Sequence, residues 1–210
     1  DFCLSRGLGD VYKRQVIKVK HLRPKIDYIA ETPYEQTLFL DTDTVVNYNI
    51  EDMFDLLSNF DFAGTHDLAR KRKKYSAVMR EYREIPYAFS EINTGVLVFQ
   101  KNEKVLNLFE TWKSTFYKYH NYCPWDQASF RISLWESIQD GLQFCTFPVE
   151  YNIRSKANRE KQRRFHHEFG EDHLAPRIYH MHADNINQGK YNVDSLEEVL
   201  QYCKENFMEY

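Results

Sequence analysis

The sequence predicts an α/β fold in which a mostly parallel sheet is flanked by helices, and three observations support that prediction. Short apolar runs alternate with amphipathic stretches along the chain, as strands alternate with crossover helices. Glycine (7) and proline (6) are scarce, so few positions interrupt regular structure. One apolar run leads directly into two aspartates, Asp41 and Asp43, and sheets of this kind hold ligand-binding groups at the carboxyl ends of their strands.

The elements expected in the first half are short. They are an exposed strand at 16–20, a helix at 26–30, an acidic strand at 38–46, a helix at 50–58, and strands at 60–64 and 95–99. The first strand alternates apolar and basic residues, and the first helix stops before Pro33. The acidic strand is apolar on both sides of its aspartates, as buried strands are. Asn49 is a favoured cap for the helix at 50–58, which carries Glu51 and Asp52 in its first turn.

The elements expected in the second half include two longer helices. They are helices at 105–119 and 127–135, strands at 142–147 and 177–181, a polar, basic loop at 155–173, and a terminal helix at 196–206. Pro148 ends the strand at 142–147, and Ser195–Glu198 forms a capping box that opens the terminal helix. No internal repeat or domain boundary is evident, so we expect a single domain.

Composition excludes several classes of protein. No apolar run approaches the length of a membrane span, and a net charge of -3 gives no nucleic-acid footprint. Cys123, Cys145 and Cys203 form an odd set without paired spacing, which favours free thiols in a reducing, cytoplasmic compartment. The basic runs at 70–74 and 163–164 fit solvated faces, with peripheral contact to an anionic membrane surface as the alternative.

The first fifteen residues are expected to be foreign to the protein. Ser5–Gln15 resembles the translation of a transposon-type sequencing adapter, so we exclude residues 1–15 from fold prediction and assign 16–210 to the domain. On that interpretation the natural chain starts before Val16. Only about 25 residues then precede Asp41, whereas a βα unit takes about thirty. A fold with βα units before its acidic strand would therefore lack the first βα units here, and this chain would be catalytically silent.

The aspartate pair is the first candidate site. Asp41 and Asp43 are two residues apart, which places both carboxylates on one face of an extended segment. Such a pair can hold a divalent cation against phosphate oxygens. Solvated turn aspartates are the alternative. His180 and His182 share one face of the last expected strand, and either one can offer an imidazole to a metal.

Three further polar clusters lie at the ends of expected elements. Asn93 and Thr94 precede a strand, and Gly95 permits close backbone approach. Asp126 precedes Gln127 at the start of a helix, where capping would explain it equally well. Arg154 follows a strand and can neutralise a phosphate or a carboxylate, a surface salt bridge being the alternative.

Taken in order, these clusters resemble the GT-A type nucleotide-diphospho-sugar glycosyltransferases, in particular the retaining group of glycogenin-like and lipopolysaccharide galactosyltransferase-like enzymes. The resemblance spans residues 32–183. It rests on five matches: Phe39-Leu-Asp-Thr-Asp43 before Ile50-Glu-Asp-Met-Phe54, Asn93-Thr-Gly-Val96, Asp126-Gln127, Tyr151-Asn152 and Ile178-Tyr-His180. The family's closing Pro-Trp is absent, and Gly189-Lys190 follows His180 only at a distance.

The resemblance implies a role for each matched residue. Asp41, Asp43 and His180 would bind Mn²⁺ or Mg²⁺, with His182 as a rival ligand. The remaining matches would serve the substrates: Thr42, Asn93, Thr94, Gly95, Arg154 and Lys190 as binding residues, Asp126 on sugar hydroxyls, and Gln127 near the anomeric carbon. The partners implied are a nucleotide-diphosphate sugar donor and a glycan, lipid or protein acceptor.

Two other functions remain open at the level of sequence. Asp41-Thr-Asp43 also resembles the haloacid-dehalogenase phosphatase motif, with Asp41 as nucleophile. That chemistry needs a later acidic pair, and Asp184 stands alone. A non-catalytic nucleotide-sugar-binding module is the other alternative, and the intact aspartates and histidine argue against it.

Overall fold

The computed structural model describes residues 2–4, 23–67, 78–154, 176–180 and 197–198. The chain divides into two compact units. The larger unit comprises residues 1–40 and 53–147, and the smaller unit comprises residues 41–52 and 148–210.

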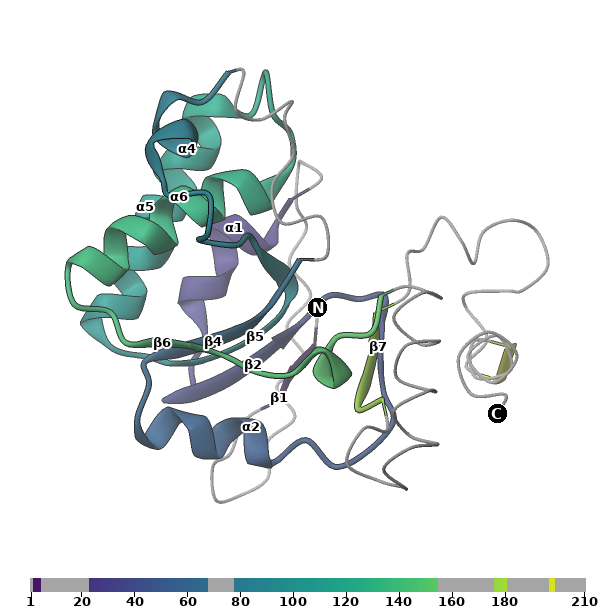
Figure 1. The fold of residues 1–210 in the computed structure, drawn as a ribbon. Coiled ribbons are helices and arrows are strands. Elements are labelled where there is room, and N and C mark those ends of the chain that lie inside the picture. The colour runs from purple at the N-terminus through teal and green to yellow at the C-terminus, as the bar shows by residue number, and fades with distance from the viewer. Residues whose placement is uncertain (1, 5–22, 68–77, 155–175, 181–196, 199–210) are drawn as a thin grey trace. The chain divides into compact units, whose positions relative to one another are not determined.

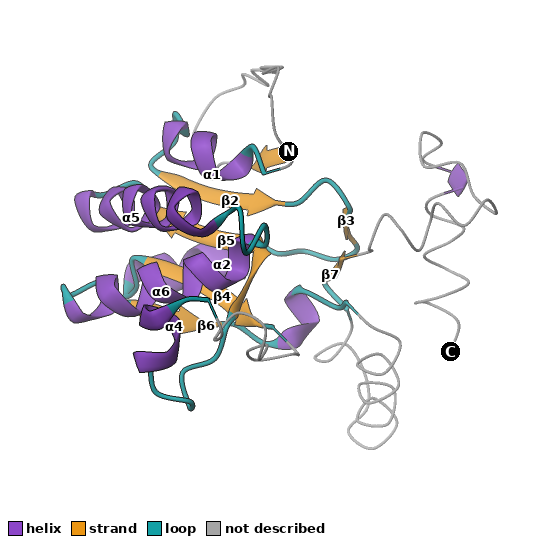
Figure 2. Cartoon of the chain, turned by 90° about the horizontal axis from the view of Figure 1, so that it is seen from above, coloured by secondary structure: helices purple, strands orange, loops and turns teal. Residues whose placement is uncertain are grey.

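A five-stranded sheet forms the centre of the larger unit, with its strands side by side in the order β1-β2-β5-β4-β6 (Figures 1 and 2). The strands are β1 (Phe2–Leu4), β2 (Gln36–Leu40), β4 (Phe62–His66), β5 (Ile92–Gln100) and β6 (Phe144–Thr146). The helices are α1 (Lys25–Tyr28) with a 3-10 turn at Ile29–Glu31, α2 (Asp52–Asp55) with a 3-10 turn at Leu56–Ser58, α4 (Arg80–Glu84), α5 (Glu103–Tyr119) and α6 (Asp126–Gln139).

The α/β fold with a helix-flanked sheet is confirmed, but the expectation of a mostly parallel sheet is wrong for the described strands. Only β4 and β6 pair in parallel, whereas β1–β2, β2–β5 and β4–β5 are antiparallel. The reason lies between β4 and β5. The segment leaving β4 at Asp67 returns at the same end of the sheet, where Asp67 N–H donates to Glu91 O at 2.9 Å. The chain therefore reverses direction between β4 and β5, which pairs them antiparallel, whereas a crossover connection would have made them parallel.

The core of the larger unit packs helices on one face of the sheet. Phe39, Phe62, Leu97 and Phe99 alternate along their strands and contact the buried faces of α5 and α6. The aromatic content of α5 explains its place: Phe109 packs edge-on against Phe99, with ring centroids 4.9 Å apart. The turn after α2 lies against the opposite face, where Met53 and Leu57 are buried (Figure 1).

The smaller unit contains a two-stranded antiparallel ribbon. Its strands are β3 (Thr44–Val46) and β7 (Ile178–His180), joined in the register Thr44↔His180 and Val46↔Ile178. A 3-10 turn at Val149–Tyr151 precedes Ile153, which bridges in parallel to Tyr179. The ribbon thus joins segments that are far apart in sequence.

Most of the expected elements that fall on described residues are confirmed, with shifted boundaries. Asn49 lies in the turn before α2, where its side-chain oxygen accepts from Glu51 N–H at 2.8 Å, and the helix itself starts at Asp52. The strand expected at 38–46 is two strands, β2 and β3, separated by a turn. Several expectations lie outside the described residues: the strand at 16–20, the basic run at 70–74, the loop at 155–173 and the terminal helix apart from the helical Glu197 and Glu198.

Two compositional points can be followed in the described part of the chain. Cys123 and Cys145 are free thiols. No described helix has the length and apolar character needed to cross a bilayer. Residues 1–15, the stretch excluded from fold prediction, include β1, which pairs with β2, and the foreign origin of that stretch stays a prediction.

Candidate functional site

Asp41 and Asp43 come together through a tight turn. Asp41 directly follows β2, and Thr44 begins β3. Thr44 N–H and Thr44 Oγ1 both donate to Asp41 O, at 3.1 and 2.7 Å. The expectation that an extended strand aligns the two carboxylates is therefore wrong, because a four-residue turn does so instead. Thr42 lies at the exposed tip of that turn.

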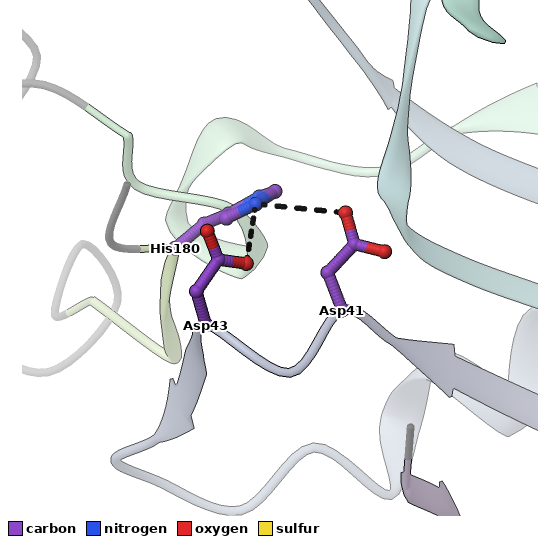
Figure 3. A group of neighbouring side chains, drawn as sticks. All are labelled: Asp41, Asp43 and His180. Atoms are coloured by element: carbon purple, nitrogen blue, oxygen red, sulfur yellow. Dashed lines mark ion pairs between the residues drawn. The ribbon is translucent and has the colours of Figure 1, made fainter. Parts of the chain in front are cut away.

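His180 is delivered to the aspartates by the ribbon. It is the last residue of β7 and pairs with Thr44, the residue after Asp43. Its backbone N–H donates to Ile153 O at 2.9 Å, and the residue is only 4% exposed. The imidazole Nε2 lies 3.2 Å from Asp43 Oδ1 and 3.8 Å from Asp41 Oδ2 (Figure 3). The structure thus brings all three predicted metal ligands together in the smaller unit.

These three groups fit a divalent cation. One ligand atom from each residue lies within 4.8 Å of the others. For metal–ligand bonds of about 2.1 Å, adjacent corners of an octahedron are about 3.0 Å apart and opposite corners about 4.2 Å. The separations of 3.2 and 3.8 Å from Nε2 fall between those limits. Both aspartates remain partly exposed, which leaves the site accessible to a ligand.

Asn152 fixes the orientation and tautomer of His180. Its Oδ1 lies 2.9 Å from His180 Nδ1, and both residues are buried. Because an amide oxygen can only accept, Nδ1 carries the proton, and Nε2 keeps its lone pair for a cation. A group that holds the far nitrogen of a ligating imidazole commonly tunes metal affinity.

Replacing Asn152 should therefore weaken metal binding without removing a ligand. We expect Asn152→Leu to lower Mn²⁺ affinity about 10- to 100-fold, because the imidazole loses its acceptor. Asn152→Asp keeps an acceptor at the same place and should bind within about threefold of the wild type. Isothermal titration of both variants with MnCl₂ measures this. Equal affinities for Asn152→Leu and the wild type would contradict the assigned role.

The larger unit holds a second polar cluster, centred on Asp126. Thr94 Oγ1 donates to Asp126 Oδ2 at 2.5 Å, and Lys25 Nζ lies 3.0 Å from the same oxygen. Arg23 Nε lies 3.7 Å from Oδ1, on the more exposed side. Lys25 Nζ also donates to Thr94 O and Thr94 Oγ1, both at 3.1 Å. Asp126 is the first residue of α6 and Trp125 holds the N-cap position, so Asp126 does not occupy the cap position expected for it.

The charge of Asp126 is strongly stabilised. Burial alone would raise the pKa of its carboxyl group, but the charges of Lys25 and Arg23 and the Thr94 hydrogen bond outweigh burial and lower the pKa from 3.8 to about 2. Asp126 is therefore ionised at neutral pH. Its Oδ1, less tightly bonded than Oδ2, keeps capacity to accept a hydroxyl.

The depressed pKa makes stability depend on pH. The unfolded chain protonates Asp126 near pH 3.8, whereas the folded chain does so only near 2. The stabilisation is thus complete above about pH 4 and should be lost as the pH falls through that window. Urea unfolding at several acidic pH values should show this slope in the wild type, with a shallower slope for Asp126→Asn. Identical slopes would contradict the assignment.

The other predicted residues of the larger unit lie beside this cluster. Gln127 Nε2 donates to Asp67 Oδ2 at 2.6 Å, so a buried carboxylate orients the Gln127 amide. Asn93 Oδ1 accepts from Gly95 N–H at 3.0 Å. Asn93 and Thr94 lie within β5, because that strand starts at Ile92 and not at Gly95 as expected.

Three predicted residues are placed less completely. Arg154 is half-buried in the smaller unit, two residues after Asn152. Lys190 and His182 lie outside the described residues. Of the two rival histidines, His180 is the one seen beside the aspartates.

Sequence analysis missed the residues that hold these clusters in place. Arg23 lies just before α1 and Lys25 is the first residue of that helix, and no motif marks either one. A lysine only 7% exposed signals a buried partner, but burial cannot be read from so short an element. Asp67 and Arg131 were missed for the same reason. The Arg131 guanidinium is fully buried and donates to the carbonyl oxygens of Phe89, Tyr82 and Pro86 at 2.9 to 3.0 Å.

Comparison with known proteins shows a family and a fold. Residues 12–193 match the model of the nucleotide-diphospho-sugar transferase family. A crystal structure of an active-site mutant of LgtC is similar, with 13% identity and a TM-score of 0.51, over 83% of this chain and 65% of that one. The galactosyltransferase LgtC in complex with donor and acceptor sugar analogs is 14% identical, with a TM-score of 0.49, over 73% of this chain and 55% of that one. The glycosyltransferase GlyE of Streptococcus pneumoniae TIGR4 is 20% identical, with a TM-score of 0.47, over 83% of this chain and 41% of that one.

Because the sequence identities are only 13% to 20%, the similarity to these solved structures concerns the fold alone. The chain spans 55% and 65% of the two LgtC chains. No curated protein matches the chain by sequence.

Proposed function

This chain belongs to the nucleotide-diphospho-sugar transferase family, and from that premise we propose that it serves a metal-dependent glycosyltransferase that moves a sugar from a nucleotide-diphosphate donor to an acceptor. The observation that carries the proposal is the convergence of Asp41, Asp43 and His180 on one point. Two carboxylates and an oriented imidazole are suited to hold a cation against a diphosphate, which two lone aspartates on a loop would do poorly.

The donor set favours Mn²⁺ over Mg²⁺. Mg²⁺ strongly prefers oxygen ligands and dehydrates reluctantly, whereas a nitrogen ligand suits the first-row transition metals. His180 supplies that nitrogen, and Asn152 holds the opposite side of its ring. The bound cation would supply electrophilic stabilisation of the negative charge that develops on the departing nucleoside diphosphate.

The residues of the larger unit would act on the sugar. Asp126 stays ionised and would accept hydrogen bonds from sugar hydroxyls, because Lys25 and Thr94 hold its carboxylate in one orientation. Gln127, oriented by Asp67, would lie near the anomeric carbon. Asn93, Thr94 and Gly95 would line the sugar pocket. Thr42, Arg154 and Lys190 would contact the donor phosphates.

The phosphatase alternative loses its support, since the matched family transfers sugars and covers most of the chain. In the smaller unit, Asp41 is also paired with an imidazole and a second carboxylate in the manner of a ligand. The other alternative, a non-catalytic binding module, is distinguished from a transferase by an activity assay.

Calorimetry tests the proposal directly. We expect Mn²⁺ to bind the 210-residue chain, and UDP or another nucleoside diphosphate to bind more tightly when Mn²⁺ is present. Donor hydrolysis or transfer by the natural gene product distinguishes a transferase from a binding module. Absence of any Mn²⁺ binding, or nucleotide binding that ignores the metal, would overturn the proposal.

A further inference from the structure

Trp125 is an exposed aromatic residue at the edge of the Asp126 cluster. It is the N-cap residue of α6 and directly precedes Asp126. The Arg23 guanidinium carbon lies 5.3 Å from the centre of the Trp125 ring, and the same guanidinium reaches Asp126. Trp125 is 42% exposed, whereas Asp126 is 4% exposed. An indole that is costly to leave in water therefore stands where the polar cluster meets solvent.

The exposed apolar side chains of the larger unit are mostly aromatic. Among its described residues, the large hydrophobic side chains that remain exposed are Val78, Tyr87, Tyr117, Tyr122 and Trp125. Tyr122 is 76% exposed and lies in the same connection between α5 and α6 as Trp125. Aromatic rings that carry a polar group suit ligands that are apolar on one side and hydrogen-bonding on the other.

A pyranose ring has that character. Its axial C–H groups form an apolar face that can stack on an indole, and its hydroxyl groups project around the rim. The Arg23 guanidinium, which lies over the Trp125 ring, offers N–H donors, and Tyr122 offers a phenol nearby in the chain. An acyl chain would instead need a continuous aliphatic surface, and Val78 is the one exposed large aliphatic side chain among the described residues of the larger unit.

We propose that Trp125 is a stacking platform for a pyranose ring of the acceptor, which makes the acceptor a saccharide. The proposal rests on the glycosyltransferase function proposed above. The gradient in exposure sets the order of the two sugars: the buried Asp126 holds the donor sugar, and the exposed Trp125 next to it receives the acceptor from solvent. Arg23, bound to both residues, keeps them in register.

Saccharide binding tests the proposal without activity. The 210-residue chain is titrated with maltotriose, lactose and chitotriose and followed by saturation-transfer NMR. We expect at least one of them to bind, Trp125→Ala to weaken that binding about tenfold, and Trp125→Phe to stay within about threefold of the wild type. Tyr48→Ala removes a side chain of similar exposure (47%) in the smaller unit and should change nothing.

Two outcomes would overturn the acceptor assignment: saccharide binding that Trp125→Ala leaves unchanged, or binding of phosphatidylglycerol vesicles with none of the saccharides. If Trp125→Ala fails to fold, Trp125→Leu, which keeps apolar bulk without an aromatic face, replaces it and should also lose binding. A Mn²⁺ titration of the same sample measures metal binding independently of saccharide binding. If Mn²⁺ binds and Trp125→Ala leaves saccharide binding unchanged, only the acceptor site is refuted. If Mn²⁺ does not bind, the proposed metal-dependent glycosyltransferase function is refuted.

Discussion

Replacing Asp43 with asparagine should weaken Mn²⁺ binding by at least about a hundredfold, since the loss exceeds the 10- to 100-fold typical of a residue that only supports a ligand. Asp43 Oδ1 is the carboxylate oxygen nearest His180 Nε2, at 3.2 Å. The amide is nearly the same size but neutral, so the cation loses a charged ligand while the turn keeps its shape. Titration with MnCl₂, followed by the loss of the free Mn²⁺ electron spin resonance signal, measures the affinity.

The matched control for this variant is Asp140→Asn, which makes the same chemical change at an exposed position of the larger unit. It should bind Mn²⁺ as the wild type does. Equal weakening in both variants would mean that overall charge, and not the ligand set, governs binding. Asp43→Asn that binds as tightly as the wild type would refute the metal site.

Replacing Lys25 with methionine should lower the free energy of unfolding by about 3 kcal/mol, because it leaves the buried Asp126 carboxylate without its closest cation. The two side chains are 7% and 6% exposed. The lower end of the usual 3–5 kcal/mol range is expected, since Arg23 remains within 3.7 Å of the carboxylate. Urea unfolding at neutral pH provides the measurement.

Two further variants distinguish a buried charge from lost packing. Lys113→Met breaks a partly exposed pair with Asp27 and should cost at most about 1 kcal/mol. Adding Asp126→Asn to Lys25→Met should recover part of the loss, because no carboxylate then remains unpaired. If Lys25→Met costs no more than Lys113→Met, the ion pair does not contribute as described.

The closeness of the Asp41 and Asp43 carboxylates could be predicted from sequence, because residues two apart can come together in either a strand or a turn. Asp41 and Asp43 were placed on one face of a strand, and the structure places them around a turn. Both geometries bring the carboxylates together, so the conclusion was correct for the wrong reason. The strand pattern offered His180 and His182 alike, and only the resemblance favoured His180, since the pairing of β3 with β7 is a long-range contact that no local pattern encodes.

The direction of the strands and the partners of Asp126 could not be predicted. Apolar periodicity shows that 92–100 is a buried strand but not which way it runs. Asp126 has the sequence position of a helix cap, and its buried partners Lys25 and Thr94 come from segments far away along the chain. Whether an aspartate caps a helix or joins an ion pair is decided by those distant partners.

If the proposed cation binds, the pairing of Thr44 with His180 would also make folding depend on ion concentration. Two short strands from distant parts of the chain form a ribbon of only three residue pairs, and closing the long segment between them costs entropy that so few hydrogen bonds offset poorly. A cation bound by Asp43 beside β3 and by His180 in β7 would link the two strands and offset that entropy cost. By mass action it would add about 2.7 kcal/mol when its free concentration is a hundred times its dissociation constant. The ribbon would then be stable at high concentrations of the ion and would open at low concentrations.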